Sequence, residues 1–263
     1  MLLLAKIVFT PILVSLVTVV GWRLGPRAGG VLAGLPLASG PVAALLVWQH
    51  GVAFGRAASE GILLGVLAAE GFVAAYALLA RRSPWPVCLA GGLGAFASLA
   101  GLAAWRSPPP TVAAPLVLAG VAGLALLLRD APAGRIAQAP PSRWDLPVRA
   151  LLTTALVVGI TAAAPALGPH LSGVIAPVPV VTAALAVYAQ RADGGDAARA
   201  LLRGVTGGLI SFWAFFAVLV AALGTWAPGA SFAAASAVAL ALQAARMAAA
   251  RTRPAPARTG AMP

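Results

Sequence analysis

Long apolar runs separated by short polar connectors fill most of the chain. A helix of roughly 20 apolar residues is long enough to cross the hydrocarbon core of a membrane. Breaks at charges and at Pro/Gly clusters divide the chain into nine such runs: 2–22, 29–50, 58–80, 86–105, 111–128, 147–167, 172–190, 203–224 and 230–250. The pattern predicts an all-α polytopic membrane protein with nine transmembrane helices.

The composition excludes the main alternatives to a membrane protein. Of the 263 residues, 61% are hydrophobic and only 9% are charged, whereas soluble domains carry about 25% charged residues. A soluble globule could not cover its surface with so few charges. Disorder is excluded as well, because it requires low hydrophobicity.

The basic residues indicate an orientation in the membrane. If the connectors alternate between two sides, three of the eighteen basic residues (Lys6, Arg56 and Arg106) fall on the N-terminal side and fifteen on the other. Cytoplasmic connectors carry the Lys/Arg excess. The split predicts a cell inner-membrane protein with its N-terminus outside and its C-terminus in the cytoplasm. The net charge of +12 is spread over these connectors, so no nucleic-acid partner is expected.

The first apolar run, 2–22, could instead be a signal peptide. Lys6 lies inside this run and no small-x-small cleavage site follows it. Both features favour a transmembrane helix.

The sequence also matches itself without gaps at an offset of 143 residues. Leu24–Pro36 overlays Leu167–Pro179, and both segments contain Leu-Gly-Pro, a later glycine and a final proline. These two residue types constrain the backbone most strongly. The same register pairs Arg56 with Arg199, Gly61 with Gly204, Gly65 with Gly208, and Phe72 with Phe215.

The offset predicts two inverted four-helix repeats joined by a linker helix. Five helices separate equivalent positions, and an odd number turns the second copy over in the membrane. The expected units are repeat one (1–110), a linker span with a cytoplasmic loop (111–146), repeat two (147–250) and a disordered basic tail (251–263). Secondary transporters are typically built this way, with a site near the midplane between the repeats.

Each repeat contains a helix that the sequence predicts to be interrupted. Two prolines and two glycines lie within Gly34–Pro41, and Pro177 and Pro179 occupy the matching region. Such breaks occur where freed carbonyls find partners in protein or in a wet cavity. Five residues near the breaks are therefore candidates for substrate binding: Pro36, Ser39, Gly40, Pro179 and Thr182. Alternatively, the prolines only kink tightly packed helices.

Glu70 lies near the centre of the run 58–80 and is the candidate proton-coupling residue. An intramembrane carboxylate costs several kcal/mol unless it is protonated, paired or facing water. At about 100° per residue, Glu70 lies roughly 180° around the helix from Gly61, on a different face from the Gly61/Gly65 pair. Its repeat equivalent is Trp213. The alternative is a protonated glutamate that donates one structural hydrogen bond.

The motifs of common enzymes are missing. The chain has no Walker A, HExxH, CxxC or GxSxG sequence. Its single cysteine is Cys88, and His50 and His170 have no metal-ligand spacing. We therefore expect no enzymatic activity, no cofactor and no metal.

The repeat unit resembles the small bacterial inner-membrane GlpM family. The residues that carry the resemblance are Gly34-Leu35-Pro36-Leu37 through Pro41, then Gly55-Arg56, and Val174 through Pro179 with Ala198-Arg199 in the second copy. The resemblance implies a tandem fusion of a unit that would otherwise pair as an antiparallel dimer. It bears on the fold more than on the function.

Three functions fit these features. The first is a secondary transporter or permease for a small or amphipathic solute, coupled to protons through Glu70. The second is a lipid flippase or an accessory subunit of an envelope lipid or polysaccharide pathway. The third is a structural membrane scaffold. The expected partners are the lipid bilayer, a small-molecule or lipid substrate, and a second copy of the chain in a homodimer.

Overall fold

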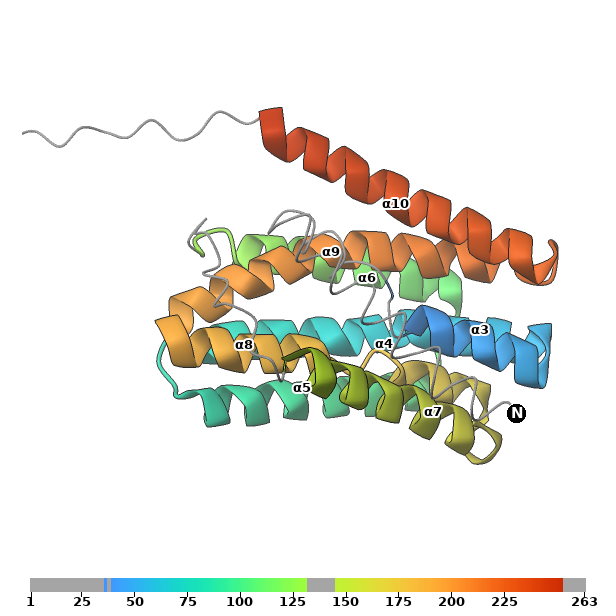
Figure 1. The fold of residues 1–263 in the computed structure, drawn as a ribbon, viewed down its shortest axis with the longest axis horizontal. Coiled ribbons are helices and arrows are strands. Elements are labelled where there is room, and N and C mark those ends of the chain that lie inside the picture. Colours follow the sequence, from blue (N-terminus) through green and yellow to red (C-terminus); the bar gives the residue numbers. More distant parts are fainter. Residues whose placement is uncertain (1–35, 37–38, 132–144, 253–263) are drawn as a thin grey trace, which may run out of the picture.

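The computed structural model describes residues 36, 39–131 and 145–252, and these residues are helical with no β-strand among them. The helices are α3 (Ser39–His50), α4 (Val52–Leu79), α5 (Trp85–Arg106), α6 (Pro110–Leu127), α7 (Asp145–Ile175), α8 (Val180–Asp193), α9 (Gly195–Ala222) and α10 (Pro228–Thr252) (Figure 1). The expected first span, the loop 132–144 and the tail from residue 253 lie outside the described residues.

Six of these helices are long and apolar enough to cross a membrane. They are α4, α5, α6 and α9, together with Val157–Ile175 of α7 and Pro228–Arg246 of α10. Helices α3 and α8 have 12 and 14 residues and rise only about 20 Å, less than a hydrocarbon core of about 30 Å. The prediction of an all-helical, multi-pass chain is confirmed to this extent, and nine spans stay a prediction.

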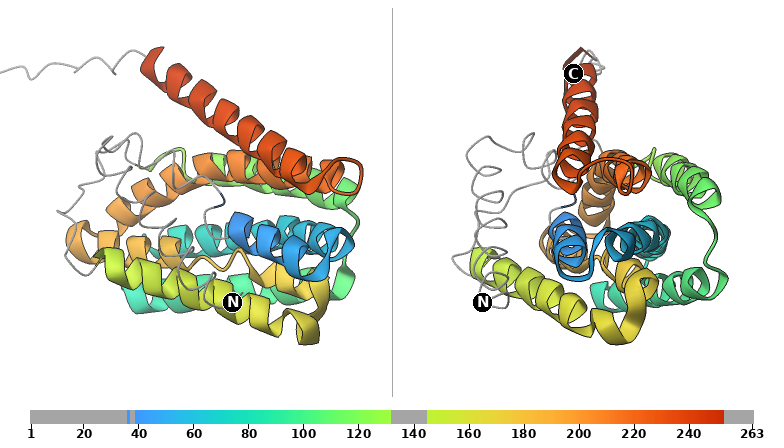
Figure 2. Two further views of the ribbon diagram at one scale, coloured as in Figure 1. Left: turned by 45° about the vertical axis from the view of Figure 1, so that its right-hand side comes forward. Right: turned by 90° about the vertical axis from the view of Figure 1, so that its right-hand side faces the viewer.

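Helices α4 and α9 form the centre of the structure. In the end-on view of Figure 2, α3, α5, α6, α7 and α9 surround α4. Within the apolar stretch of each helix, 67% of the residues of α4 are buried, against 22% for α6 and for α10. The outer faces of α5 and α6 expose leucines such as Leu102 and Leu116. An apolar outer surface of this kind suits contact with lipid.

The two central helices run antiparallel. At one end, Arg56 of α4 donates a hydrogen bond to the carbonyl of Leu223, directly after α9, with an N–O distance of 3.4 Å. At the other end, Gly195 of α9 packs against the carbonyl of Ala80, directly after α4. Each helix therefore begins where the other ends, as Figure 1 also shows.

Helix boundaries recur at the 143-residue offset found in the sequence. Helices α4 and α9 both contain 28 residues and begin at 52 and 195, and α5 and α10 begin at 85 and 228. The residues before α4 and α9, Gly51 and Gly194, have φ angles of 86° and 84°. Glycine adopts this left-handed region at little cost. In Figure 1, α3, α4 and α5 run opposite to α8, α9 and α10, respectively.

The glycines of α4 form a seam against the end of α7. A Cβ added to Gly61 would lie 3.1 Å from the Cα of Gly173, and one added to Gly65 would lie 2.8 Å from the Pro177 ring. Small residues allow such close helix approaches in membranes. The equivalent glycines of α9 would face residues 25–34, which lie outside the described part of the chain.

We predict that Gly65→Ala destabilises the protein by about 1–3 kcal/mol, because the new methyl group would overpack the contact with Val174 and Pro177. The measurement is the melting temperature in detergent. Gly123→Ala is the matched control, since a Cβ at this α6 glycine has nothing within 4 Å. Equal melting temperatures for the two variants would contradict the seam.

Candidate functional site

The chain is interrupted between α7 and α8. Helix α7 kinks at Gly168, where φ is 75° and ψ is 170°, and its last segment ends at Ile175. Helix α8 starts at Val180, after two prolines that cannot donate backbone hydrogen bonds. Short turns bridge the gap: Ala176 donates to the Gly173 carbonyl at 3.1 Å, and Ala183 donates to Pro179 at 2.7 Å. The interruption is thus an ordered turn.

The start of α3 packs against this interruption. The Ser39 hydroxyl donates a buried hydrogen bond to the carbonyl of Ala176, with an O–O distance of 3.3 Å. The chain enters α3 from Pro36, whose carbonyl accepts a 2.7 Å hydrogen bond from the Gly40 amide. A Cβ on Gly40 would lie 3.7 Å from the Pro36 ring and 3.8 Å from the Phe215 ring of α9. Three separate parts of the chain converge here.

The candidate substrate-binding residues divide between the two sides of this contact. Pro36, Ser39 and Gly40 are buried at the start of α3. On the other side, Pro179 is buried and Thr182 is half-buried at the start of α8. The structure therefore joins the first group to the turn at Ala176, and the second group follows that turn along the chain.

Glu70 lies on a different face of α4 from the interruption. Its side chain is only 5% exposed, and its Oε2 packs against Gly120 of α6. Among the described residues, its Oε1 has no hydrogen-bond partner. Gly65 faces Pro177 on the opposite side of α4, so the helix itself separates this carboxyl group from the break.

The repeat equivalent of Glu70 also faces α6. The indole Nε1 of Trp213 donates a 3.1 Å hydrogen bond to the carbonyl of Ala114. Ala114 and Gly120 each lie three residues from Val117, which is fully buried on α6. Equivalent positions of α4 and α9 therefore contact α6 symmetrically about Val117, one through a carboxyl group and the other through an indole.

An ion-pair network ties three helices together at one end of the molecule. Asp130, just after α6, accepts hydrogen bonds from Arg81 at 2.6 Å and from Arg199 at 2.7 Å. The Arg199 side chain is only 6% exposed and also lies 3.5 Å from Asp196. The hydrogen bond from Arg199 is the largest cause that holds the pKa of Asp130 below its usual value. The network joins the end of α4, the end of α6 and the start of α9.

The opposite end has a weaker arrangement at the equivalent position. Arg56 lies 3.6 Å from Glu60 and donates to the Leu223 carbonyl at 3.4 Å, but its side chain is 47% exposed. The sequence analysis paired Arg56 with Arg199 and missed Asp130. The available signal was an acidic residue directly after an apolar run. Nothing in the sequence pattern shows that two arginines converge on it.

The chemistry available in the described residues is limited to proton binding and hydrogen bonding. No group of three His, Cys, Asp or Glu side chains in this part of the chain could hold a metal ion. Cys88 is buried, and its thiol lies 3.4 Å from the carbonyl of Ser83. The groups that could act on a solute are the hydroxyls and carbonyls at the break and the Glu70 carboxyl.

We predict that Asp130→Asn lowers the melting temperature in detergent at pH 7 by a few degrees. The ionised carboxylate stabilises the folded state, and this contribution is lost as the pH falls, because the folded-state pKa of Asp130 is lowered. The difference between wild type and variant should be full at pH 7 and close on acidification below about pH 4. A difference that persists unchanged in acid would show that the network does not depend on the charge of Asp130.

Comparison of the chain with protein-family models, with curated proteins and with solved structures finds no match. The resemblance to the GlpM family therefore stays a prediction. The function has to be argued from the geometry of the break, of Glu70 and of the arginine network.

Proposed function

We propose that the chain is a secondary transporter built from two inverted repeats. The observation that carries this proposal is the buried hydrogen bond from Ser39 to the Ala176 carbonyl, which joins the start of α3 to the turn between α7 and α8. The 143-residue offset pairs Ser39 with Thr182, just beyond that same turn. In secondary transporters, interrupted helices from the two repeats meet at a midplane site.

The matching helix boundaries support the inverted arrangement. Helices α4 and α9 begin 143 residues apart and run in opposite directions. A two-fold axis through α6 near Val117 would exchange Glu70 with Trp213, and Ala114 with Gly120, in agreement with the contacts of both pairs. Helix α6 would then be the linker that turns the second repeat over.

The residues around the break favour a solute with few charges. Ser39 and Thr182 provide hydroxyls, and the interrupted backbone provides carbonyl groups such as that of Ala176. Pro36, Gly40 and Pro179 complete the proposed lining. We propose a small or amphipathic solute, because hydrogen-bonding groups here greatly outnumber ionisable ones.

Glu70 would couple transport to protons indirectly. Its carboxyl group is buried between α4 and α6, without a hydrogen-bond partner for Oε1 among the described residues. A charged carboxylate in this place would be strongly disfavoured without water. Loss of the proton would therefore favour a state in which α4 and α6 separate enough to admit water. The same movement would shift the other face of α4, which supports the break through Gly65.

The arginine-rich end would lie in the cytoplasm and the C-terminus with it, following the distribution of basic residues. A lipid flippase is the second candidate, favoured by two grooves that open at the sides of the bundle. A rigid scaffold is the third. The three differ in whether water reaches the break.

Cysteine labelling tests this proposal without a known substrate. Cys88→Ser gives a cysteine-free chain, into which Ser39→Cys or Thr182→Cys is introduced one at a time. In proteoliposomes, we predict that both cysteines react with a charged, membrane-impermeant methanethiosulfonate reagent, because transport must expose the break to water. Leu118→Cys is the control, since Leu118 lies on the outer face of α6 and would be surrounded by lipid.

The outcomes separate the candidate functions. Labelling at positions 39 and 182 without labelling at 118 supports a transporter. No labelling at 39 or 182 contradicts it and favours a scaffold. Labelling at all three positions would show that the assay does not distinguish the break from the lipid-facing surface, and would remove this support.

We also predict that Glu70→Gln removes the pH dependence of Thr182→Cys labelling. In the parent chain, the labelling rate, corrected for the reagent's own pH dependence on a free thiol, should change between pH 5 and pH 8. Glutamine keeps the shape of glutamate but cannot titrate, so the corrected rate should become flat. Glu60→Gln, at the half-buried pair with Arg56, is the matched control. A pH profile unchanged in Glu70→Gln would remove this residue from the mechanism.

A further inference from the structure

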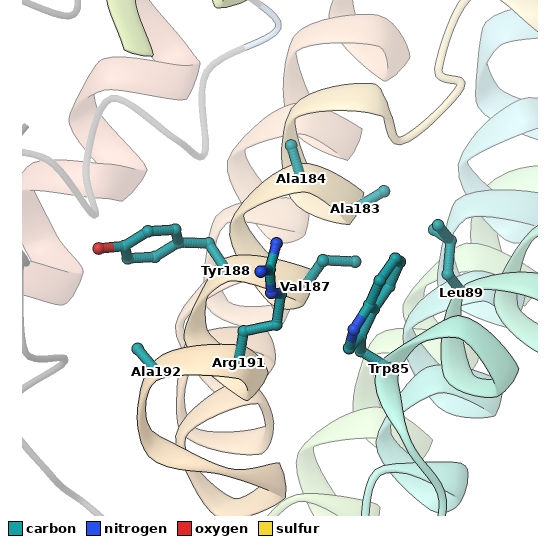
Figure 3. Close-up of a pocket in the computed structure, with 8 residues that line it drawn as sticks. All are labelled: Trp85, Leu89, Ala183, Ala184, Val187, Tyr188, Arg191 and Ala192. Atoms are coloured by element: carbon teal, nitrogen blue, oxygen red, sulfur yellow. The ribbon is translucent and has the colours of Figure 1, made fainter. Parts of the chain in front are cut away.

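A groove of about 720 Å³ opens at the side of the molecule between α5 and α8 (Figure 3). Its floor and walls are apolar, formed by Leu89, Ala183, Ala184 and Val187. Aromatic and charged side chains are placed around this apolar surface. Figure 3 shows Arg191 between Trp85 and Tyr188.

Arg191 is the only charged residue of the groove lining. Its guanidinium carbon lies 5.9 Å from the centre of the Trp85 ring, within the range of a cation–π contact. The residue is exposed and forms no ion pair with the acids of the described chain. An arginine in this position has free donors for an anionic oxygen ligand such as a phosphate.

The groove lies at the arginine-rich end of the bundle. Trp85 begins α5 directly after the connector with Arg81 and Arg82, and Arg191 lies in the last turn of α8. Trp and Tyr side chains prefer the boundary between membrane and water. The groove therefore combines a surface for a hydrocarbon chain, aromatic residues at interface depth and an unpaired cation.

We infer that this groove binds one anionic phospholipid from the leaflet at the arginine-rich end. Its acyl chain would lie along Leu89 and Val187, and Arg191 would donate hydrogen bonds to the phosphate, with Trp85 at glycerol depth. Charge complementarity selects this occupant, because an apolar groove alone would accept any lipid. This lipid site does not depend on transport and would exist equally in a scaffold.

A second groove provides an internal comparison. Its volume is about 400 Å³, and it lies between the α3–α4 corner and the start of α10. The 143-residue offset relates Trp85 to Pro228, Leu89 to Phe232, Val187 to Ala44 and Arg191 to Trp48, and these four counterparts all line the second groove. Tryptophan therefore stands where the first groove has arginine. We expect charge selection in the first groove only.

The experiment measures lipid binding to the purified full-length chain by native mass spectrometry. Phosphatidylglycerol and phosphatidylcholine with identical acyl chains are titrated separately, and the dissociation constant of the first bound lipid is determined for each. Wild type should bind phosphatidylglycerol about fivefold more tightly, the effect expected from one arginine at an anionic headgroup. In Arg191→Gln, the two lipids should bind equally.

Two further variants separate a specific site from general attraction. Arg106→Gln also removes an arginine stacked on a tryptophan, with 4.7 Å to the Trp105 ring, but Arg106 does not line either groove. This variant should keep the wild-type preference. Ala184→Trp fills the groove and leaves Arg191 in place, so it should weaken the binding of both lipids.

The inference is overturned if Arg191→Gln keeps the fivefold preference, if Arg106→Gln loses it to the same extent, or if Ala184→Trp binds both lipids as wild type does. The circular dichroism spectrum and melting temperature identify variants that fold. Because Arg191→Gln and Ala184→Trp alter different properties of the groove, a folding defect in one leaves the other to decide. Failure of the cysteine-labelling test would leave these binding results unaffected.

Discussion

Interrupted backbone inside an apolar bundle is the constraint on which the rest of the structure depends. A carbonyl or amide freed by proline and left in hydrocarbon costs several kcal/mol unless a partner satisfies it. The turn from Ala176 to Pro179 meets this requirement with local hydrogen bonds and with the Ser39 hydroxyl. The turn can lie so deep only because Gly61 and Gly65 bring α4 close to it. Packing and backbone chemistry are therefore coupled at one place.

The two halves share a backbone plan, but their side chains differ at each functional position. Glu70 corresponds to Trp213, Arg191 to Trp48, and the buried Arg199 to the half-exposed Arg56. If the halves arose by duplication, as we propose, the backbone geometry was kept while the chemistry became specialised. In the first and third pairs, the residue with the stronger electrostatic role lies deeper in the protein than an exposed surface charge would. In the second pair, the charge lies at the edge of a lipid-sized groove.

Much of the backbone could be predicted from the sequence, because apolar length and Pro/Gly placement act locally. The prolines at 177 and 179 predicted an interruption, and the helix does stop at Ile175 and restart at Val180. The helical angle placed Glu70 away from Gly61, and the structure adds that its neighbour is Gly120. The boundaries of α3 and α8 were predicted less well, because apolar runs do not show where within them a helix begins.

The convergence of distant side chains could not be predicted. Asp130 meets Arg81 and Arg199 only after three helices pack, and the lipid-sized groove requires α5 and α8 to lie side by side. Such contacts depend on helix rotation and tilt, which periodicity constrains poorly when nearly every face is apolar. The same limitation applies to the Ser39–Ala176 contact, whose partners are 137 residues apart.

The most direct test of the account is a disulfide cross-link between the two interrupted regions. In the Cys88→Ser chain, Ser39→Cys and Ala176→Cys are combined, and the membranes are oxidised with copper phenanthroline. We predict an intramolecular disulfide, seen as a reducible shift in the mobility of the monomer after cleavage of the loop 132–144. A Ser39→Cys and Leu118→Cys pair should not cross-link. The account is contradicted if the 39–176 pair gives no disulfide, or gives only dimers linked between two chains.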